Sequence, residues 1–389
     1  MRPQPLTRRI IKLSFQDHAF KPLLSRREVW QRWSIPPFPP LHQDTSPPPP
    51  QRVPARRTNK AMRVTAIYTY PIKALRGIRL QEARLGPQGV EHDRRFMLCR
   101  VDDGDGEARL RNVTLAANPH CALFAQELAG PDILVRYLAP DPPVVPPDPD
   151  PASVLRVPLR PDVAGLAKAR VNLHQSLVDA HRMGAPYDDW FTARFGFPTV
   201  LVFIGDERRP IPGTFAPVPD PCRGPAPWLA FSDLSPFLFT STQSLGNVSA
   251  RLSGGAMDMA KFRPNIVVDG EAEYDEDYWV DLSVRGEPAF TLTDMCCRCS
   301  SINVDYDTGR LAQGDHGIVL KKLMADRRVD LGYKYGPVFG KYGSLVPGRD
   351  SLTLRVGDPV TVESRSLERP VSDWPHKSKK DARLYQYSA

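Results

Sequence analysis

Arg63-Val-Thr-Ala-Ile-Tyr-Thr-Tyr70 is dense in β-branched and aromatic residues, and Pro71-Ile-Lys-Ala-Leu-Arg-Gly77 follows it directly. This composition, ended by proline and glycine, predicts a β-strand followed by a turn. Segments of the same kind recur at short intervals: Arg79–Leu85, Arg95–Val101, Ala122–Leu128, Ile133–Leu138, Val154–Leu159 and Val171–Leu173. Closely spaced short strands favour a mainly β fold, a barrel or a sandwich, over alternating strands and helices.

From about residue 186 onward, the sequence mixes both kinds of element. Aromatic residues at helical spacing predict a helix over Pro186–Phe195, and Ser235–Leu252 is expected to begin a second helix after a cap region rich in Ser and Asp. Gly317–Met324 fits neither pattern clearly. Further strands are expected at Thr199–Ile204, Ile266–Val268 and Phe290–Thr293, with a terminal pair within Ser351–Val362.

Proline-rich stretches divide the chain. Ser34–Pro54 is expected to be an extended linker, because proline fixes φ and removes a backbone donor. Residues 140–151 lie between two predicted strands and are interpreted as a loop insertion. We therefore expect a disordered, basic N-terminal extension over 1–61, a β-barrel domain over 62–205, a second barrel over 206–366, and a frayed polar tail over 367–389.

The net charge of +8 lies in the N-terminal extension. Residues 1–60 hold twelve of the 52 Lys and Arg and three of the 44 Asp and Glu, which leaves 40 basic and 41 acidic residues elsewhere. The balanced body argues against a nucleic-acid-binding protein. The pattern Arg8-Arg-Ile-Ile-Lys-Leu-Ser-Phe15 is similar to a mitochondrial presequence, and an ordinary disordered extension is the alternative. No run approaches the ~20 apolar residues of a membrane span.

Half of the six cysteines lie close together. Cys296, Cys297 and Cys299 surround Arg298, whereas Cys99 and Cys121 lie in apolar runs and are expected to be buried. This uneven distribution is not a disulfide framework and indicates a reducing, intracellular environment, mitochondrial or cytoplasmic. A nearby cation lowers the pKa of a thiol, and thiolates serve as nucleophiles, redox groups or ligands for soft metals.

The Cys296-x-x-Cys299 spacing leaves two other interpretations open. One is half of a zinc site, although no pair of histidines at ligand spacing supplies the other ligands. The other is a thioredoxin-like redox pair, which requires the motif to open a helix in a βαβ unit. Here it follows a predicted strand and precedes the turn-rich segment that contains Asp305-Tyr-Asp-Thr-Gly309.

Several other segments carry groups that bind anions. Guanidinium groups bind oxygen atoms in pairs, and a helix N-terminus offers free N–H groups to phosphate. The candidates are Lys73 and Arg76 in the turn after the first strand, Arg94 before another strand, Arg263 and Asn265 before a third, and Ser232, Asp233 and Ser235 at the expected helix start.

The motifs occur in a distinctive order. They are Tyr-Pro-Ile-Lys (70–73), Asp-Arg-Arg-Phe (93–96), Ser-Asp-x-Ser-Pro-Phe-Leu (232–238), Lys-Phe-Arg-Pro-Asn (261–265), Cys-x-Arg-Cys and Val-Asp-x-Asp-Thr-Gly (within 296–309), Phe-Gly-x-Tyr (339–342) and Val-Gly-Asp-Pro-Val (356–360). As a set, this series resembles the MOSC family, and in particular its branch of mitochondrial amidoxime-reducing components. The resemblance implies an N-terminal MOSC β-barrel domain packed on a C-terminal MOSC barrel with a few helices.

The resemblance implies a molybdenum cofactor, molybdenum bound to molybdopterin. The metal ligand would be Cys299, and Cys299 and Asp233 are expected to act in catalysis. The residues expected to hold the pterin and its phosphate are Lys73, Arg94, Ser232, Asp233, Ser235, Arg263, Asn265, Arg298 and Tyr342. Three positions depart from the pattern: Ala74 stands where relatives commonly carry serine, Tyr306 stands where they carry proline, and Cys297 is an additional thiol.

The implied activity is reduction of N-hydroxylated compounds. A family-level association with pyridoxal phosphate has no counterpart here, because no pyridoxal-binding lysine motif is evident. No cysteine-rich iron–sulfur segment follows Ser366, so electrons are expected from a separate donor, by resemblance a cytochrome b5 with its reductase. The alternatives are a carrier of sulfur as a Cys299 persulfide, a protein that binds or delivers the cofactor, and a nucleic-acid binder acting through the basic extension.

Overall fold

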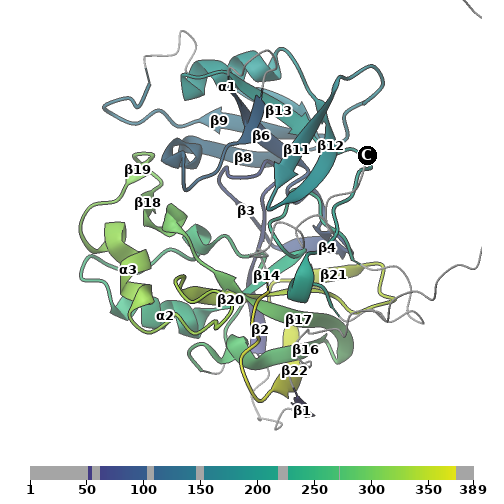
Figure 1. Ribbon diagram of the computed structural model, residues 1–389, viewed down its shortest axis with the longest axis vertical. Helices are drawn as coiled ribbons and strands as arrows, with labels where there is room; N and C mark the ends of the chain where they lie inside the picture. The colour runs from purple at the N-terminus through teal and green to yellow at the C-terminus, as the bar shows by residue number, and fades with distance from the viewer. Residues whose placement is uncertain are drawn as a thin grey trace, which may run out of the picture. The chain divides into compact units, whose positions relative to one another are not determined.

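The first predicted strand is present as β2 (Met62–Thr69), and it closes a barrel. In the computed structural model, which describes residues 51–54, 62–102, 109–145, 153–217, 227–270 and 272–373, β2 pairs with β15 (Ile266–Val268) and with β22 (Pro359–Ser366). Continuing around the barrel from β22, the strands are β16 (Trp279–Val284), β17 (Glu287–Cys297), β20 (Val338–Leu345) and β14 (Phe237–Ser241), next to β15 (Figure 1). The mainly β prediction is confirmed.

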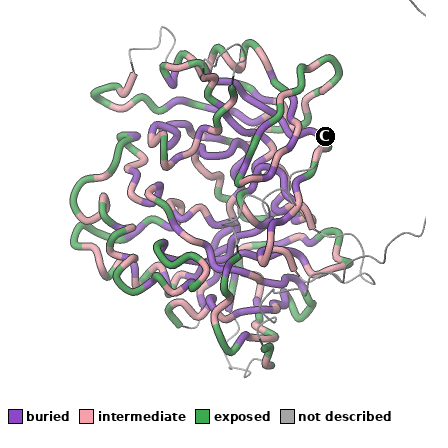
Figure 2. Tube along the Cα trace, in the orientation of Figure 1, coloured by how far each residue is buried: buried purple, intermediate pink, exposed green. Residues whose placement is uncertain are grey.

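Alternation along the strands fills this barrel. Phe237 and Phe239 of β14 point into the apolar interior, where the ring of Phe239 lies 4.9 Å from that of Phe290. The intervening Leu238 points out of the barrel and lines a cavity. Successive strand side chains face opposite sides, so one run of apolar residues serves both surfaces. Figure 2 shows the strands of the barrel largely buried.

A second group of strands comes from residues 96–203. A five-stranded antiparallel sheet has the order β11 (Lys168–Leu173), β12 (Ser176–Arg182), β13 (Thr199–Phe203), β6 (Phe96–Asp102) and β7 (Arg109–Asn112). A three-stranded sheet has the order β10 (Leu155–Pro158), β9 (Asp132–Tyr137) and β8 (Phe124–Ala129). Phe96 and Leu98 face the cluster that contains Phe124, whereas Met97 and Cys99 face the opposite cluster.

The short strands β3 (Ile78–Leu80), β4 (Glu82–Gly86) and β5 (Gly89–Val90) follow β2. β4 pairs with β21 (Leu352–Arg355), so residues 62–90 are hydrogen-bonded to strands from the second half of the chain. The predicted domain boundary between 205 and 206 stays a prediction. The proline-rich residues 140–151 fall between the antiparallel strands β9 and β10, and 146–152 lie outside the described residues.

Three α-helices accompany the strands in the described ranges. α1 (Tyr187–Phe195) confirms the first predicted helix and ends at Gly196, whose φ of 72° is left-handed. α2 is Thr242–Ala250, and α3 (Val319–Met324) lies in the segment that fitted neither pattern. The 3-10 turns are η1 (Pro119–Leu123), η2 (Gly213–Phe215), η3 (Met259–Phe262), η4 (Asp275–Tyr278), η5 (Ser300–Asn303) and η6 (Gly314–Ile318).

The expected start of the second helix is wrong. Residues Phe237–Ser241 form strand β14, and helix α2 begins only at Thr242. Ser241 is the N-cap, because its side chain accepts a hydrogen bond from the backbone N–H of Ser244. The apolar run after Ser235 is buried on both faces, as in a central strand, and this outweighed the cap signal at Ser235.

Several other elements differ from expectation. Arg52–Pro54, assigned to the extension, forms β1 against β22, and β18 (Val304–Asp305) with β19 (Arg310–Leu311) forms a small hairpin that was not predicted. The strands β7, β12, β16 and β20 were also missed. Residues 367–373 are held rather than frayed: Arg369 Nε donates to Asp277 Oδ2 at 2.8 Å. Residues 374–389, like 1–50, lie outside the described residues.

Glu276 makes folding stability depend on pH. Its carboxyl group is fully buried; burial raises its pKa from 4.5 to about 7, although hydrogen bonds from Ser244 and Ser241 partly oppose the shift. The folded protein therefore keeps the proton over a range where the unfolded chain releases it, so stability falls as pH rises from about 4.5 to 7. Glu276→Gln, which cannot ionise, should raise the free energy of unfolding more at pH 8 than at pH 5. The difference should be on the order of 3 kcal/mol at about 1.36 kcal/mol per pKa unit.

Urea unfolding of both proteins at pH 5 and pH 8 measures this difference. Glu287→Gln, at an exposed strand end, is the matched control and should leave the pH dependence as it is in the wild type. Equal pH dependence of wild type and Glu276→Gln would contradict the assignment.

Candidate active site

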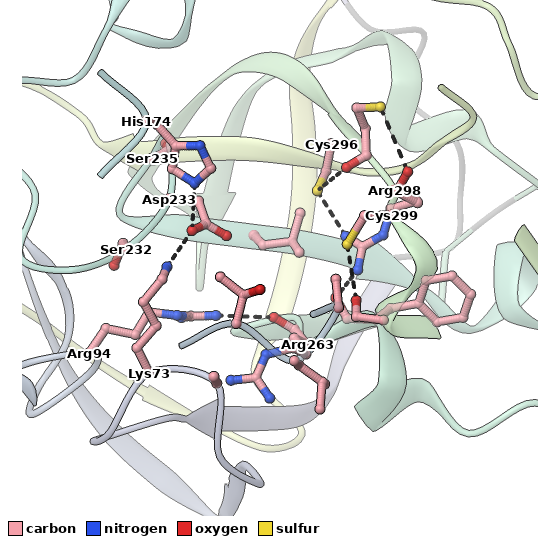
Figure 3. A pocket seen from close by; sticks show the side chains of 18 of the residues that line it. Lys73, Arg94, His174, Ser232, Asp233, Ser235, Arg263, Cys296, Arg298 and Cys299 are labelled. Atoms are coloured by element: carbon pink, nitrogen blue, oxygen red, sulfur yellow. Dashed lines mark hydrogen bonds and ion pairs between the residues drawn. The ribbon is translucent and has the colours of Figure 1, made fainter. Parts of the chain in front are cut away.

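The ten residues that the resemblance assigned to the cofactor and the metal line one cavity of about 430 Å³ (Figure 3). They are Lys73, Arg94, Ser232, Asp233, Ser235, Arg263, Asn265, Arg298, Cys299 and Tyr342. Arg76 is not among the lining residues: its guanidinium group donates to the carbonyl oxygens of Ala122 and Tyr306 instead. These residues therefore form one candidate site, although the first and the last of them, Lys73 and Tyr342, are more than 200 positions apart in sequence.

The order of strands in the barrel explains this convergence. β17, β20, β14, β15 and β2 are consecutive neighbours. Lys73 follows β2 and Asn265 precedes β15, and these strands are antiparallel, so the two residues leave the barrel at the same edge. Cys299 follows β17, three places further along, and reaches the cavity from a different strand end. Side chains at the ends of adjacent strands lie close together, because neighbouring strands are only about 4.8 Å apart.

Tyr70 supports two of the cations. The Arg94 and Arg263 guanidinium carbons lie 4.5 and 4.4 Å from the centre of its buried ring, and Tyr70 Oη donates to Pro264 O at 3.0 Å. An aromatic face attracts cations because of its quadrupole. Tyr70 was not among the predicted site residues, although its place at the start of the Tyr-Pro-Ile-Lys motif was a signal that could have identified it.

Four residues that line the cavity have left-handed backbone conformations. The φ angles are 75° at Ala74, 48° at Arg94, 51° at His174 and 55° at Arg263. Such angles are uncommon for residues with a Cβ and cost free energy, which surrounding contacts must offset. At these four positions the left-handed backbone directs the side chain toward the cavity, which the backbone of a regular strand or helix would not do.

Asp233 is bonded from two sides. Lys73 Nζ contacts its Oδ1 and donates to Phe231 O at 2.9 Å, while His174 Nε2 lies 2.9 Å from the same carboxylate oxygen. Burial raises the pKa of Asp233, but Lys73 and His174 outweigh that effect, and the pKa lies well below its ordinary value. The carboxylate is therefore ionised at neutral pH. Its half-exposed side chain opens into the cavity.

The segment that carries Ser232, Asp233 and Ser235 is a loop before β14, not the helix start that was expected. Arg209 organises it: the buried guanidinium group donates to Ala230 O at 3.0 Å and to Ser232 O at 2.8 Å. Its other amino group donates to Leu173 O at 3.0 Å. Burial lowers the pKa of Arg209 to about 10. No motif pointed to this residue, because its partners are backbone carbonyls from distant segments.

Two guanidinium groups in the cavity have no carboxylate partner among the described residues. Arg263 Nη1 donates to Leu75 O at 2.8 Å, and Arg298 Nη2 donates to Phe262 O at 2.7 Å. In the described part of the chain, Arg298 Nε and Ser232 Oγ are also buried without a hydrogen-bond partner. Buried polar groups are normally satisfied, so unpaired cations and orphan donors indicate a site for an anionic ligand.

The three clustered cysteines have different surroundings. Cys296 is buried, its Sγ lying 2.8 Å from Arg298 Nη1 and 3.1 Å from Tyr342 Oη. Burial raises its pKa, and Arg298 only partly opposes the shift. Cys297 is half-buried, and burial raises its pKa to about 12. Cys299 is exposed, with its Sγ 3.2 Å from Ser301 Oγ.

Neither alternative for the Cys-x-x-Cys motif fits this arrangement. Cys296 lies in strand β17 and Cys299 precedes the short 3-10 turn η5, so the motif does not open a helix of a βαβ unit. Within the described ranges, no group of three or more His, Cys, Asp or Glu side chains is placed to hold a metal ion.

The exposure of these thiols predicts their reactivity. Iodoacetamide at pH 8 should label Cys299 before Cys297, since a thiol of pKa about 12 is roughly one part in 10⁴ ionised at that pH. Cys121, fully buried, is the internal control and should react only on unfolding. A time course of peptide mass spectra, on protein from a host that makes no molybdenum cofactor, measures the order. Labelling of Cys297 as fast as Cys299 would contradict it.

Comparison with known proteins agrees with the order of the motifs. Residues 61–197 match the MOSC N-terminal beta barrel domain, and residues 226–361 match the MOSC domain. The chain is 29% identical to human mitochondrial amidoxime-reducing component 1 over 312 residues, which cover 76% of this chain and 82% of that protein. It is 28% identical to the component 2 protein of Macaca fascicularis, over 78% of this chain and 84% of that protein.

More partial similarities also occur. The molybdenum cofactor sulfurase of rice is 30% identical over 195 residues, which cover 47% of this chain but 22% of that protein. A solution structure of a Bordetella bronchiseptica protein covers 31% of this chain at 13% identity with a TM-score of 0.21, too slight a likeness to bear on the fold. No described helix is both long and apolar enough to cross a membrane. With its two matched domains in this order, the chain belongs to the MOSC domain family.

Proposed function

We propose that this protein is a molybdenum-cofactor-dependent oxidoreductase that reduces N-hydroxylated compounds. The observation that carries the proposal is the exposed thiol of Cys299 on a cavity that also contains unpaired Arg263 and Arg298. Two relatives that align over most of their length are amidoxime-reducing components by name, and a further relative is a molybdenum cofactor sulfurase. These names motivate the substrate class and the cofactor.

The residues in the cavity fit such a cofactor. A molybdopterin carries a phosphate and a polar ring, which suit unpaired guanidinium groups, the orphan Ser232 Oγ and the amide of Asn265. A thiolate is a soft ligand suited to molybdenum. When bound, the cofactor supplies the two-electron chemistry, and the protein binds, orients and tunes it. The residues proposed to hold it are the ten that were nominated from the sequence.

Two of the proposed residues have distinct tasks. Cys299 would hold the metal, since its thiol is exposed to the cavity whereas Cys296 is buried against Tyr342. Asp233 is ionised and accepts hydrogen bonds from Lys73 and His174, so it orients these groups and does not itself donate a proton at neutral pH. The Ala74 methyl group, in a left-handed turn, offers no hydroxyl contact to the cofactor.

The remaining parts of the proposal concern partners. Electrons would come from a separate donor protein, a cytochrome b5 with its reductase, and small N-hydroxylated molecules would be the substrates. A mitochondrial location is proposed because the relatives are named for that organelle. No nucleic-acid partner is proposed.

Metal analysis tests the central claim. Protein from a host that makes molybdenum cofactor should contain near-stoichiometric molybdenum, and oxidation should release a fluorescent pterin. Cys299→Ser should lose the metal and the reductase activity, because its hydroxyl replaces the soft ligand. Cys297→Ser is the matched control and should keep both, since the pKa of Cys297, about 12, keeps that thiol protonated.

Absence of both molybdenum and pterin from the wild type would refute the proposal. The protein would then be tested for a persulfide on Cys299, because the similarity to a cofactor sulfurase favours a sulfur carrier as the second candidate. Sulfane sulfur released by a reductant from the wild type, and not from Cys299→Ser, would support that function.

A further inference from the structure

His174 is a cavity residue that no sequence motif nominated. It lies in the turn between β11 and β12, where its φ of 51° turns the side chain toward the cavity. Its Nε2 lies 2.9 Å from Asp233 Oδ1, and its side chain is 44% exposed. Figure 3 shows the Asp233 carboxylate between the His174 imidazole and the Lys73 ammonium group. The imidazole thus contacts the site and solvent at once.

The proposed reaction, on which this inference rests, consumes protons. Breaking the N–O bond of an N-hydroxylated compound and releasing its oxygen as water takes two electrons and two protons. The two electrons stay on the nitrogen, which takes one proton to form an N–H bond. The hydroxyl oxygen takes the other proton and leaves as water. The electrons come from the external donor, whereas the protons must enter the cavity.

The other titratable residues of the cavity are poorly suited to donate and recover a proton near neutral pH. Burial raises the pKa of Cys296 and Tyr342, and that of Cys297 to about 12, so these groups keep their protons. The guanidinium groups do not titrate. Burial lowers the pKa of Lys73, but Asp233 opposes this shift, and the buried ammonium group is bonded to Phe231 O and Asp233, away from the solvent that would have to return its proton. Histidine is the side chain whose charge ordinarily changes between about pH 5 and 8.

We propose that His174, oriented by Asp233, is the proton donor of the cavity. The carboxylate accepts a hydrogen bond from Nε2–H, so Nδ1 is the nitrogen that gains and releases the proton. The imidazolium passes this proton through cavity water to the departing oxygen. Solvent then restores it through the exposed part of the ring and also supplies the second proton.

The charged groups nearest to His174 belong to the contacts of Asp233. Asp233 Oδ1 contacts the imidazole directly, Lys73 contacts the same carboxylate, and Arg209 donates to the backbone carbonyl of Asp233. The neighbouring strand β7, which packs on β11, contributes the neutral Asn112 to the cavity wall. Among the described residues, Asp233 is therefore the carboxylate that orients the imidazole.

His174→Gln tests the proposal, because the glutamine amide can still donate to Asp233 but cannot carry a proton. We expect kcat to fall at least about tenfold, since positioned proton donors contribute about 10²–10⁴ in rate. The pH–rate profile of the variant should differ from that of the wild type, and added imidazole should restore part of the rate. Molybdenum and pterin contents should equal those of the wild type. His316→Gln, at a half-buried histidine outside the cavity, is the control and should behave as wild type.

A second readout does not depend on turnover. NMR spectra of histidine-labelled protein should contain an imidazole signal that is missing in His174→Gln, and Asp233→Asn should move that signal, because the carboxylate that Nε2 contacts is lost. An unmoved signal in Asp233→Asn, or an unchanged pH–rate profile in His174→Gln, would overturn the proposal. Wild-type protein without molybdenum or reductase activity would refute the proposed function instead, and the NMR result would still decide the pairing.

Discussion

Unpaired positive charge is the constraint on which the cavity depends. Arg298 is buried and Arg263 is half-buried, and within the described residues neither has a carboxylate partner. Burying such groups costs several kcal/mol unless other interactions offset it. The Tyr70 ring, the carbonyls of Leu75 and Phe262, and the left-handed turns around the cavity are the groups that hold them. The arrangement is stable with these contacts and becomes fully satisfied only with an anion in place.

The single cavity carboxylate has a different setting. Asp233 contacts both Lys73 and His174. Because the charges of Asp233 and Lys73 cancel, the arginines are the source of the net positive potential. The site is thus divided between a half with a matched ion pair and a half with excess positive charge and thiols. A phosphate would find complementary charge in the second half, where the thiols also lie.

Much of the cavity lining was predictable, because it consists of residue types that occur within short motifs. Lys73, Arg94, Arg263 and the cysteines were identified from cations and thiols next to predicted strands. Residues that act through tertiary contacts were not identified. Arg209 donates to backbone carbonyls, and it has this role only once the 230–233 loop is folded. His174 is a single histidine in a hairpin turn, a position without any sequence pattern.

The fold shows the same division. Strands such as β2 and β13 were found from β-branched composition, whereas β20 (Val338–Leu345), interrupted by Gly340 and Gly343, was missed. Gly340 has φ 82° and lies so close to Phe239 O that a Cβ would approach within 2.6 Å. The close approach of another strand requires glycine at this position. From composition alone, a glycine inside a strand is taken for the end of the strand.

The pairing of β2 with β22 also sets an order of events. Met62 is hydrogen-bonded in register with Val360, so the barrel cannot close until almost the entire described chain has left the ribosome or crossed a membrane. Contacts this far apart in sequence form late and slowly. Lys73 and Tyr342 line the same cavity, so its wall is complete only once residues 73–342 have been synthesised. Partly synthesised or truncated chains would expose the β2 edge and its apolar residues, making them substrates for chaperones and proteases and not partial carriers of the ligand.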